Sequence, residues 1–303
     1  MEVEEVLRMN GGEGETSYAN NSLIQKEVMF KAKPVIEESI KNLLYHFSSF
    51  PECFRMADFG CSSGPNTLSL VWEIKHIVDT TSRKLNCKTP MSLPNFYKML
   101  EEDKGSEFGP CFIAGMPGNF YGRLFPNNFL HFVHSSYILQ WRSQVPEGLV
   151  SETGIPLNKG NIYRTKTSPT TVFKAYLNLF ERDFTMFLRS QTKLDWFNLP
   201  CYAPAVEEAR HVIHEEGSFT IEHLEIFEVG WDANIGKGNE SDKNERGKYV
   251  AMSIIAVVEF ILASHFGAEI IDGLFERFAR KIEDYLQVEK GEYTSMVISM
   301  TKG

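Results

Sequence analysis

Apolar residues along the chain alternate between short runs and longer stretches with helical spacing. Short runs of β-forming residues predict strands, and apolar residues that recur at every third or fourth position predict helices. After a turn-rich segment at 11–22, a helical pattern continues as far as Leu44. Because strands and helices then alternate, we expect an α/β fold with a mainly parallel sheet flanked by helices. The expected strands are 54–59, 111–114, 129–134, 219–228 and 294–300, and the expected helices lie near 67–80, 167–189, 205–215 and 250–288.

The pattern fails at two joins, 88–95 and 189–198, where no apolar strand follows a helix. A doubly wound sheet needs its second strand soon after the first helix, so the first join leaves the expected fold incomplete. We hypothesise that the molecule carries further residues after Pro90 and near Gln191. An intact mass equal to the 34.6 kDa of the present sequence would refute that hypothesis.

The segment 55–67 passes from an apolar run through a turn of small residues into a helical pattern. Gly60 and Gly64 permit close backbone approach to a ligand, and Asn66 can cap the helix. Open α/β sheets bind small molecules at such turns. Two glycines four residues apart, without a third, do not form the dinucleotide fingerprint, which disfavours a nicotinamide-dependent dehydrogenase. S-adenosyl-L-methionine, an adenosyl ligand without phosphates, suits the turn better, and an ordinary strand-to-helix turn is the structural alternative.

Composition narrows the class of protein. With 303 residues, 43% of them hydrophobic, the chain can bury the core of a single unit, and its net charge of −9 argues against a nucleic-acid partner. Five widely spaced cysteines suggest neither disulfides nor zinc, and eight histidines show no HExxH or facial-triad spacing. The acidic N-terminus is unlike a signal peptide, and no apolar stretch approaches the length that spans a bilayer. We expect a cytoplasmic protein with a small-molecule substrate, no metal and no membrane association.

No obvious acid–base pair emerges from the sequence, which agrees with methyl transfer from a sulfonium donor. Such a donor carries its own leaving group, and a carboxylate acceptor is already ionised at neutral pH. The enzyme would then need no catalytic residue and would act by holding two reactants in line, worth up to ~7–11 kcal/mol. The loop 115–125 could press Phe120 against an adenine, and the segment after the third expected strand presents Tyr137, Gln140 and Trp141. Simple core packing is the alternative role for both segments.

Seven motifs stand in order along the chain: MNGGEGETSYANNS at 9–22, ADFGCSSGPNT at 57–67, PGNFYGRLF at 117–125, HSSY at 134–137, NKGNIY at 158–163, FNLP at 197–200 and ASHFG at 263–267. Together they resemble the plant SABATH methyltransferases, which include salicylate, benzoate and jasmonate carboxyl methyltransferases and the xanthine N-methyltransferases of caffeine synthesis. The resemblance implies a Rossmann-like class I methyltransferase core, an α-helical cap over the acceptor, and a homodimer. Within a single unit, residues 1–303, the core would comprise about 23–150, 190–230 and 290–303, and the cap about 151–189 and 248–288.

The resemblance also implies which residues contact the donor. The family usually has serine where this chain has Asn119, whose amide can replace the hydroxyl. Its acidic ribose-binding residue lies in a Leu-Asn-Asp-Leu segment after the second strand, and no such segment follows Pro90. The implied donor contacts are Tyr18 and Ser22 in the N-terminal loop, Asp58 and Gly60 at the turn, and Asn119 and Phe120 in the aromatic loop.

For the acceptor, the resemblance leaves two classes open. Carboxylate-methylating relatives clamp the acid between a glutamine and a tryptophan, and Gln25 and Trp141 stand at the matching positions. Gln140 instead resembles a residue of the xanthine enzymes, and it would read the purine edge together with Tyr137. Val258 stands where the coffee-type xanthine enzymes place a tyrosine, so that aromatic wall is missing here.

We therefore expect an enzyme that transfers the methyl group of S-adenosylmethionine to a small aromatic carboxylic acid of the salicylate or benzoate type. The alternative enzyme is a xanthine N-methyltransferase of the caffeine pathway. A non-catalytic small-molecule binder that kept the fold is an alternative from a different class. Two cap residues, Ile255 and Phe260, replace the arginine and proline usual in the family and would reshape the cap.

Overall fold

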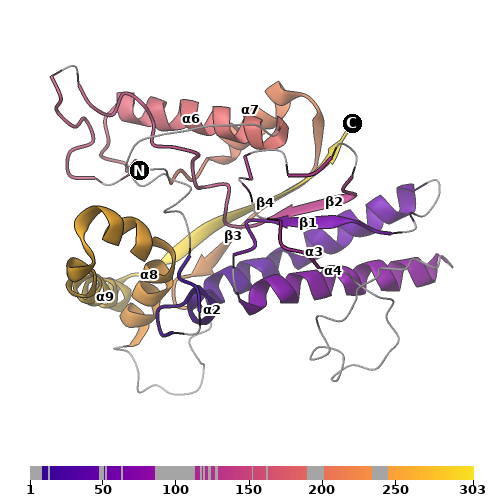
Figure 1. Ribbon diagram of the computed structural model, residues 1–303, viewed down its shortest axis with the longest axis horizontal. Helices are drawn as coiled ribbons and strands as arrows, with labels where there is room; N and C mark the ends of the chain where they lie inside the picture. The colour runs from indigo at the N-terminus through magenta and orange to yellow at the C-terminus, as the bar shows by residue number, and fades with distance from the viewer. Residues whose placement is uncertain are drawn as a thin grey trace.

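The computed structural model places a group of strands between two helical layers, with a further helical pair at one end (Figure 1). It describes residues 9–47, 51–85, 113–189, 201–233 and 245–303, apart from the single positions 13, 52, 63, 117, 119, 122, 123, 127, 128, 152 and 162. The elements in chain order are α2 (Tyr18–Asn21), α3 (Leu23–His46), β1 (Met56–Phe59), α4 (Pro65–Lys84), β2 (Phe132–Ser135), α6 (Thr170–Arg189), α7 (Val206–Glu216), β3 (Phe219–Gly230), α8 (Glu245–Phe266), η1 (Ala268–Ile270), α9 (Ile271–Val288) and β4 (Glu292–Lys302).

The strands form two pairs of opposite kind. β1 and β2 run parallel, with Met56 opposite Phe132. β3 and β4 form a longer antiparallel pair that starts with Phe219 opposite Lys302. Four of the five expected strands are thus confirmed, whereas the fifth, 111–114, lies half outside the described residues and its described half has no regular structure. Within the described residues only β1 and β2 meet the expectation of a mainly parallel sheet.

The helical layer formed by α3 and α4 supports the parallel pair. Ile36 and Ile40 recur at helical spacing on α3 and pack with Ile74 and Val78 of α4 in one buried cluster. Burying each such side chain contributes about 1.5–3 kcal/mol relative to leaving it in water. α4 begins with Pro65, which is favoured at a first helical position because its missing N–H would have no partner there. The predicted helices in both segments are confirmed.

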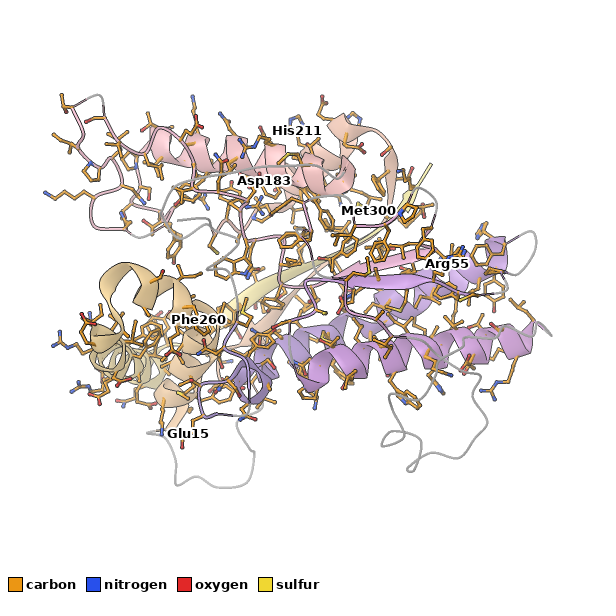
Figure 2. All side chains as sticks on the ribbon, viewed as in Figure 1. Glu15, Arg55, Asp183, His211, Phe260 and Met300 are labelled. Atoms are coloured by element: carbon orange, nitrogen blue, oxygen red, sulfur yellow. The ribbon has the colours of Figure 1, made fainter. Side chains whose placement is uncertain are left out.

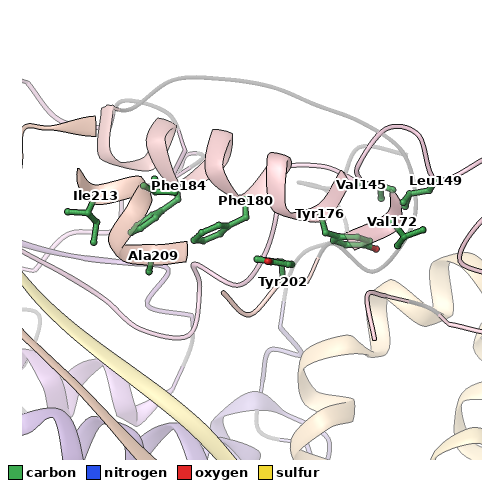
Figure 3. Packing of buried hydrophobic residues seen from close by; sticks show 10 residues of the cluster. Val145, Leu149, Val172, Tyr176, Phe180, Phe184, Tyr202, Ala209 and Ile213 are labelled. Atoms are coloured by element: carbon green, nitrogen blue, oxygen red, sulfur yellow. The ribbon is translucent and has the colours of Figure 1, made fainter. Parts of the chain in front are cut away.

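On the other side of the strands, α6 and α7 enclose an aromatic cluster (Figure 3). The rings of Phe180 and Phe184 lie 5.5 Å apart between centroids on α6, and Tyr202 approaches Phe180 at 5.4 Å. Ile213 of α7 is buried in the same cluster, and residues of β3 and β4 pack against it. α6 therefore shares its core with α7 and the antiparallel strands. The assignment of 151–189 to a cap stays a prediction.

The apolar stretch 250–288 forms two helices, α8 and α9, separated at Gly267. Ala251 and Ile255 of α8 pack against Ile271 and Phe275 of α9. The expectation that no apolar stretch is long enough to span a bilayer is wrong, because Arg246–Ser264 meets that test by length and composition. In this structure 39% of that stretch is buried, and α8 lies against α9 and α2.

Candidate functional site

The turn after β1 packs tightly against two distant segments. Gly60 has φ +72° and Gly64 has φ +107°, a backbone region that favours glycine. A side chain at Gly60 would collide with Ile138, and a Cβ at Gly64 would lie 2.9 Å from the Cα of Ala19. The two glycines thus let the N-terminal loop, the turn and the segment after β2 converge at the carboxyl end of β1.

Residues expected to contact the donor gather around this turn. The Asn66 side-chain amide donates to both the backbone oxygen and the hydroxyl of buried Ser22, each at 2.9 Å. Asp58 stands at the end of β1, where its carboxylate is 2.7 Å from Nδ1 of His134. Burial raises the pKa of Tyr18 to about 12, and the charge of Asp58 adds to that shift. The structure therefore brings Tyr18, Ser22, Asp58 and Gly60 together around one turn, and their contact with the donor stays a prediction.

The aromatic loop, residues 115–125, contacts the segment that follows β2. Asn119 lies outside the described residues, and its predicted donor contact stays a prediction. Phe120 is half-buried, with its ring 4.5 Å from that of Tyr121 between centroids. The Tyr121 hydroxyl donates to the backbone oxygen of Trp141. Burial raises the pKa of Tyr121 to about 12, so this phenol keeps its proton at neutral pH.

A cavity of about 2510 Å³ opens beside the turn. That volume exceeds the ~300–1,000 Å³ of an ordinary small-molecule site, so the cavity can admit more than one ligand. The described residues that we expect to contact the donor do not line this cavity. His134, the neighbour of Asp58, does line it. All five residues expected to contact the acceptor line this cavity: Gln25, Tyr137, Gln140, Trp141 and Val258.

Two of these residues have features that are typical of ligand sites: a buried polar atom without a partner and an uncommon backbone conformation. Oε1 of Gln25 is buried without a hydrogen-bond partner, which costs about 1–3 kcal/mol unless a ligand supplies one. Rotating the amide by 180° would present its N–H₂ group at the same place. Tyr137 adopts φ +59°, a conformation that costs on the order of 1–3 kcal/mol for a bulky residue and that clusters at ligand sites.

Backbone hydrogen bonds hold the segment that carries Gln140 and Trp141. The Tyr202 N–H donates to the oxygen of Gln140 at 2.7 Å, and the Trp141 N–H donates to that of Ile138 at 2.9 Å. Trp141 also forms an isolated bridge with Cys201. With 6% of its surface exposed, Trp141 is both a core residue and part of the cavity wall. The two interpretations of Trp141 are thus compatible.

The sequence analysis did not predict the buried network that Arg142 and Ser143, which follow Trp141 in the chain, form with Asp183. Asp183, on the strand-facing side of α6 in Figure 2, accepts hydrogen bonds from the N–H and the hydroxyl of Ser143, each at 2.7 Å. Arg142 approaches the same carboxylate at 3.8 Å and lies 5.0 Å over the ring of Phe180. Burial raises the pKa of Asp183, and Arg142 opposes that shift. The sequence signal is weak, because Arg142 directly follows a mostly apolar run and Asp183 stands beside the charged Arg182 within a mostly apolar stretch.

The helix α8, which the sequence assigns to the cap, also contributes to the cavity. Val258 is partly buried and lines the cavity, so no aromatic ring closes that wall at this position. Ile255 is buried against α9 instead, and Phe260 lies on α8 (Figure 2). Asn10 ties the N-terminal loop to this helix, because its side chain bonds Glu259 and its N–H donates to Ala256 at 3.0 Å. In the described part of the chain no three His, Cys, Asp or Glu side chains could hold a metal ion.

Comparison with known proteins agrees with this arrangement. The chain matches the family described as SAM dependent carboxyl methyltransferase over residues 4–92, 91–193 and 190–303. It is 38% identical to "Probable caffeine synthase 4" of Coffea arabica, covering 100% of this chain and 98% of the relative. It is 39% identical to "Probable jasmonic acid carboxyl methyltransferase 2" of Theobroma cacao, covering 100% of both. A solved structure, "Loganic acid methyltransferase with SAH", superposes with a TM-score of 0.78 at 27% identity, covering 97% of this chain and 98% of the other.

The matched segments meet at 91–92 and 190–193, within the two joins where the sequence lacks an expected strand. The alignment with the Coffea relative extends over 378 positions, whereas this chain has 303 residues, so the relative has residues without a counterpart here. That the molecule carries further residues at these two joins stays a prediction, which the intact mass of the protein tests. The matches cover nearly the whole chain, and the solved relative is named with the demethylated donor. The chain therefore belongs to the SABATH family of carboxyl methyltransferases and is an S-adenosylmethionine-dependent methyltransferase.

Proposed function

We propose that this enzyme methylates the carboxyl group of a small aromatic acid of the salicylate or benzoate type. The observation that carries the proposal is that Gln25 and Trp141 line the same cavity, with Oε1 of Gln25 buried and without a hydrogen-bond partner. Burying a carboxylate costs several kcal/mol unless it is hydrogen-bonded. The rotated Gln25 amide and the indole N–H of Trp141 are donors that would offset this cost.

The residues around the β1 turn suit the donor. S-adenosylmethionine, when bound, supplies a methyl group on a cationic sulfur, and the S–C electron pair stays on sulfur as the new O–C bond forms. Asp58 offers a carboxylate to the donor's N–H and O–H groups, and Ser22 offers a hydroxyl. We assign the donor to this turn and the acceptor to the cavity, with Tyr137 at the boundary.

The chain's own part in the reaction is placement rather than proton transfer. A carboxylate acceptor is ionised at neutral pH, so no general base has to remove a proton. Tyr137 and Trp141 would fix the plane of the acceptor, and Gln25 would fix its carboxylate. Holding the oxygen in line with the methyl carbon and excluding water supplies the acceleration.

The second candidate is N-methylation of a xanthine. It is favoured by Gln140 on the cavity wall and by the Gln25 oxygen, which as placed would accept a purine N–H. The relatives named caffeine synthases support it as well. Against it, Val258 leaves the wall without an aromatic ring.

One experiment separates the two candidates: methyl transfer from labelled donor to a panel of benzoates and xanthines. Wild-type activity on benzoates alone supports the carboxyl assignment, and activity on xanthines alone overturns it. Trp141→Phe should raise the acceptor KM about tenfold, the cost of one hydrogen bond to a charged group, without changing affinity for S-adenosylhomocysteine. Unchanged kinetics would count against the clamp.

Gln25→Glu tests the same clamp through charge. A second carboxylate facing the acid would raise the KM for a benzoate strongly, whereas a xanthine N–H could still donate to it. Gln25→Met, of similar shape and without charge, is the matched control. A benzoate KM that rises equally in both variants would show that Gln25 acts through its shape alone.

We further propose that the enzyme is a cytoplasmic homodimer, as the sequence predicts. Light scattering coupled to size exclusion measures the oligomeric state, and imaging of a tagged chain in plant cells shows where the protein is located. A monomeric mass at micromolar concentration would overturn the dimer.

A further inference from the structure

His134 has no role in the function proposed above, yet its side chain meets one of the residues assigned to the donor. β1 and β2 are parallel, and their register places Asp58 directly opposite His134. The Nδ1 atom of His134 is 2.7 Å from Oδ1 of Asp58, and only 12% of each side chain is exposed. The contact joins residues 76 positions apart in the chain.

The direction of this hydrogen bond follows from the chemistry of its partners. A carboxylate accepts only, so the proton must lie on Nδ1 of His134. Among the described residues, His134 is the one hydrogen-bond partner of the Asp58 side chain. Oδ1 is thereby engaged, while Oδ2 is left to accept from a ligand.

Neighbouring groups indicate that the Asp58 carboxylate faces the turn. Its charge contributes to the raised pKa of Tyr18 in the N-terminal loop and of Cys61 directly after Gly60. Tyr18 and Gly60 belong to the set assigned to the donor. His134 itself lines the acceptor cavity, so the pair stands where the two sites adjoin.

We propose that His134 is a positioning residue of the donor site, which fixes the Asp58 carboxylate so that its second oxygen meets the N–H or O–H groups of S-adenosylmethionine. This inference rests on the proposed assignment of the donor to the β1 turn. A carboxylate held in one orientation before binding loses less freedom when the ligand arrives, which raises affinity. A residue that acts in this way should change donor affinity more than acceptor affinity.

The test compares His134→Phe with His134→Asn in calorimetric titrations with S-adenosylhomocysteine. The asparagine amide can place an N–H near the position of Nδ1, whereas phenylalanine cannot donate. We expect His134→Phe to weaken binding about tenfold and His134→Asn to stay within about threefold of wild type. Because His134 also lines the acceptor cavity, the acceptor KM is measured alongside, and in His134→Phe the loss of donor affinity should exceed any rise in that KM. Equal affinity in all three proteins, or equal losses in the two variants, would overturn the proposal.

Combination with Asp58→Asn shows whether His134 acts through Asp58. If it does, His134→Phe adds little to the loss already caused by Asp58→Asn, whereas additive losses would contradict the proposal. His214→Phe is the matched control, because His214 also pairs with a carboxylate but is 87% exposed. Should His134→Phe fail to fold, His134→Val, which suits a strand and lacks a donor, replaces it in every comparison.

The titrations also distinguish this inference from the proposed acceptor. Weak binding by His134→Phe supports the positioning role even if the wild-type enzyme methylates no benzoate. Normal binding by His134→Phe overturns the role even if benzoate is the substrate. A wild-type protein that does not bind S-adenosylhomocysteine would overturn both the donor site and the role of His134.

Discussion

The buried pair formed by Arg142 and Asp183 gives a sharp prediction about how the acceptor wall is held. Asp183 is 0% exposed and Arg142 1% exposed, so neither charge is solvated by water. Nη2 of Arg142 donates to the backbone oxygen of Leu139, whereas Nε and Nη1 have no hydrogen-bond partner, so the Asp183 carboxylate is the nearby anion that offsets this buried positive charge. Asp183→Asn removes that charge while an amide oxygen can still accept the Ser143 N–H.

The expected cost follows from the environment of each partner. Removing one member of a buried ion pair costs about 3–5 kcal/mol, because the other charge is left uncompensated. Arg182, 3.5 Å from the same carboxylate, is 44% exposed and contributes little. We therefore expect Asp183→Asn to lower the free energy of unfolding by about 3–5 kcal/mol. Because Trp141 precedes Arg142 directly, the acceptor KM should rise as well.

Urea unfolding followed by circular dichroism measures this cost, and the double variant Arg142→Met with Asp183→Asn tests its cause. When both charges are gone, no uncompensated ion remains, and the double variant should be more stable than Asp183→Asn alone. The reasoning is refuted if Asp183→Asn unfolds at the wild-type urea concentration. It is equally refuted if the losses of the two single variants simply add.

Three further predictions concern other parts of the molecule. Gly60→Ala should weaken binding of S-adenosylhomocysteine, because its φ of +72° disfavours alanine and the new methyl group would collide with Ile138; wild-type affinity would contradict this. Gly247→Ala should lower the melting temperature, since its Cβ would strike a backbone oxygen of α9, whereas Gly273→Ala, with open space around it, should raise the temperature slightly. Burial raises the pKa of Tyr121 from 10.0 to about 12, so its stabilisation is complete below pH 10 and is lost between pH 10 and 12, about 3 kcal/mol in all. The free energies of unfolding of wild type and Tyr121→Phe should therefore approach each other as the pH rises from 10 to 12. A difference between them that stays constant over this range would argue against the burial of Tyr121.

Most elements of the fold could be predicted because their signals are local. The stripe of Ile36 and Ile40 recurs at helical spacing, and the turn at Gly60 is bounded by an apolar run and a helical pattern. The expected cap by Asn66 is not formed, because its side chain donates to Ser22 and α4 begins after Gly64 without a side-chain cap. The antiparallel pairing of β3 with β4 was missed because strand direction depends on where the chain returns, across α8 and α9. The sequence analysis also missed that α8 is long and apolar enough to span a bilayer, because its apolar residues were counted in one helical pattern with those of α9.

The sequence motifs named residues that the structure places along one cavity, while their contacts with an acceptor stay a prediction. Gln25, Tyr137, Gln140, Trp141 and Val258 were expected at the acceptor and line one cavity. The sequence could not show that Oε1 of Gln25 lacks a hydrogen-bond partner, because that depends on every group that packs around it.

The sequence by itself determined the family, the strand-to-helix turn at Gly60 and the order of most helices and strands, since each is written in residues close together along the chain. Only the tertiary structure decided that Asp58 faces His134 and that Asp183 supports Ser143, pairs separated by 76 and 40 positions. No local pattern encodes such contacts, because they form only when the strand register and the packing of α6 bring the partners within hydrogen-bond distance.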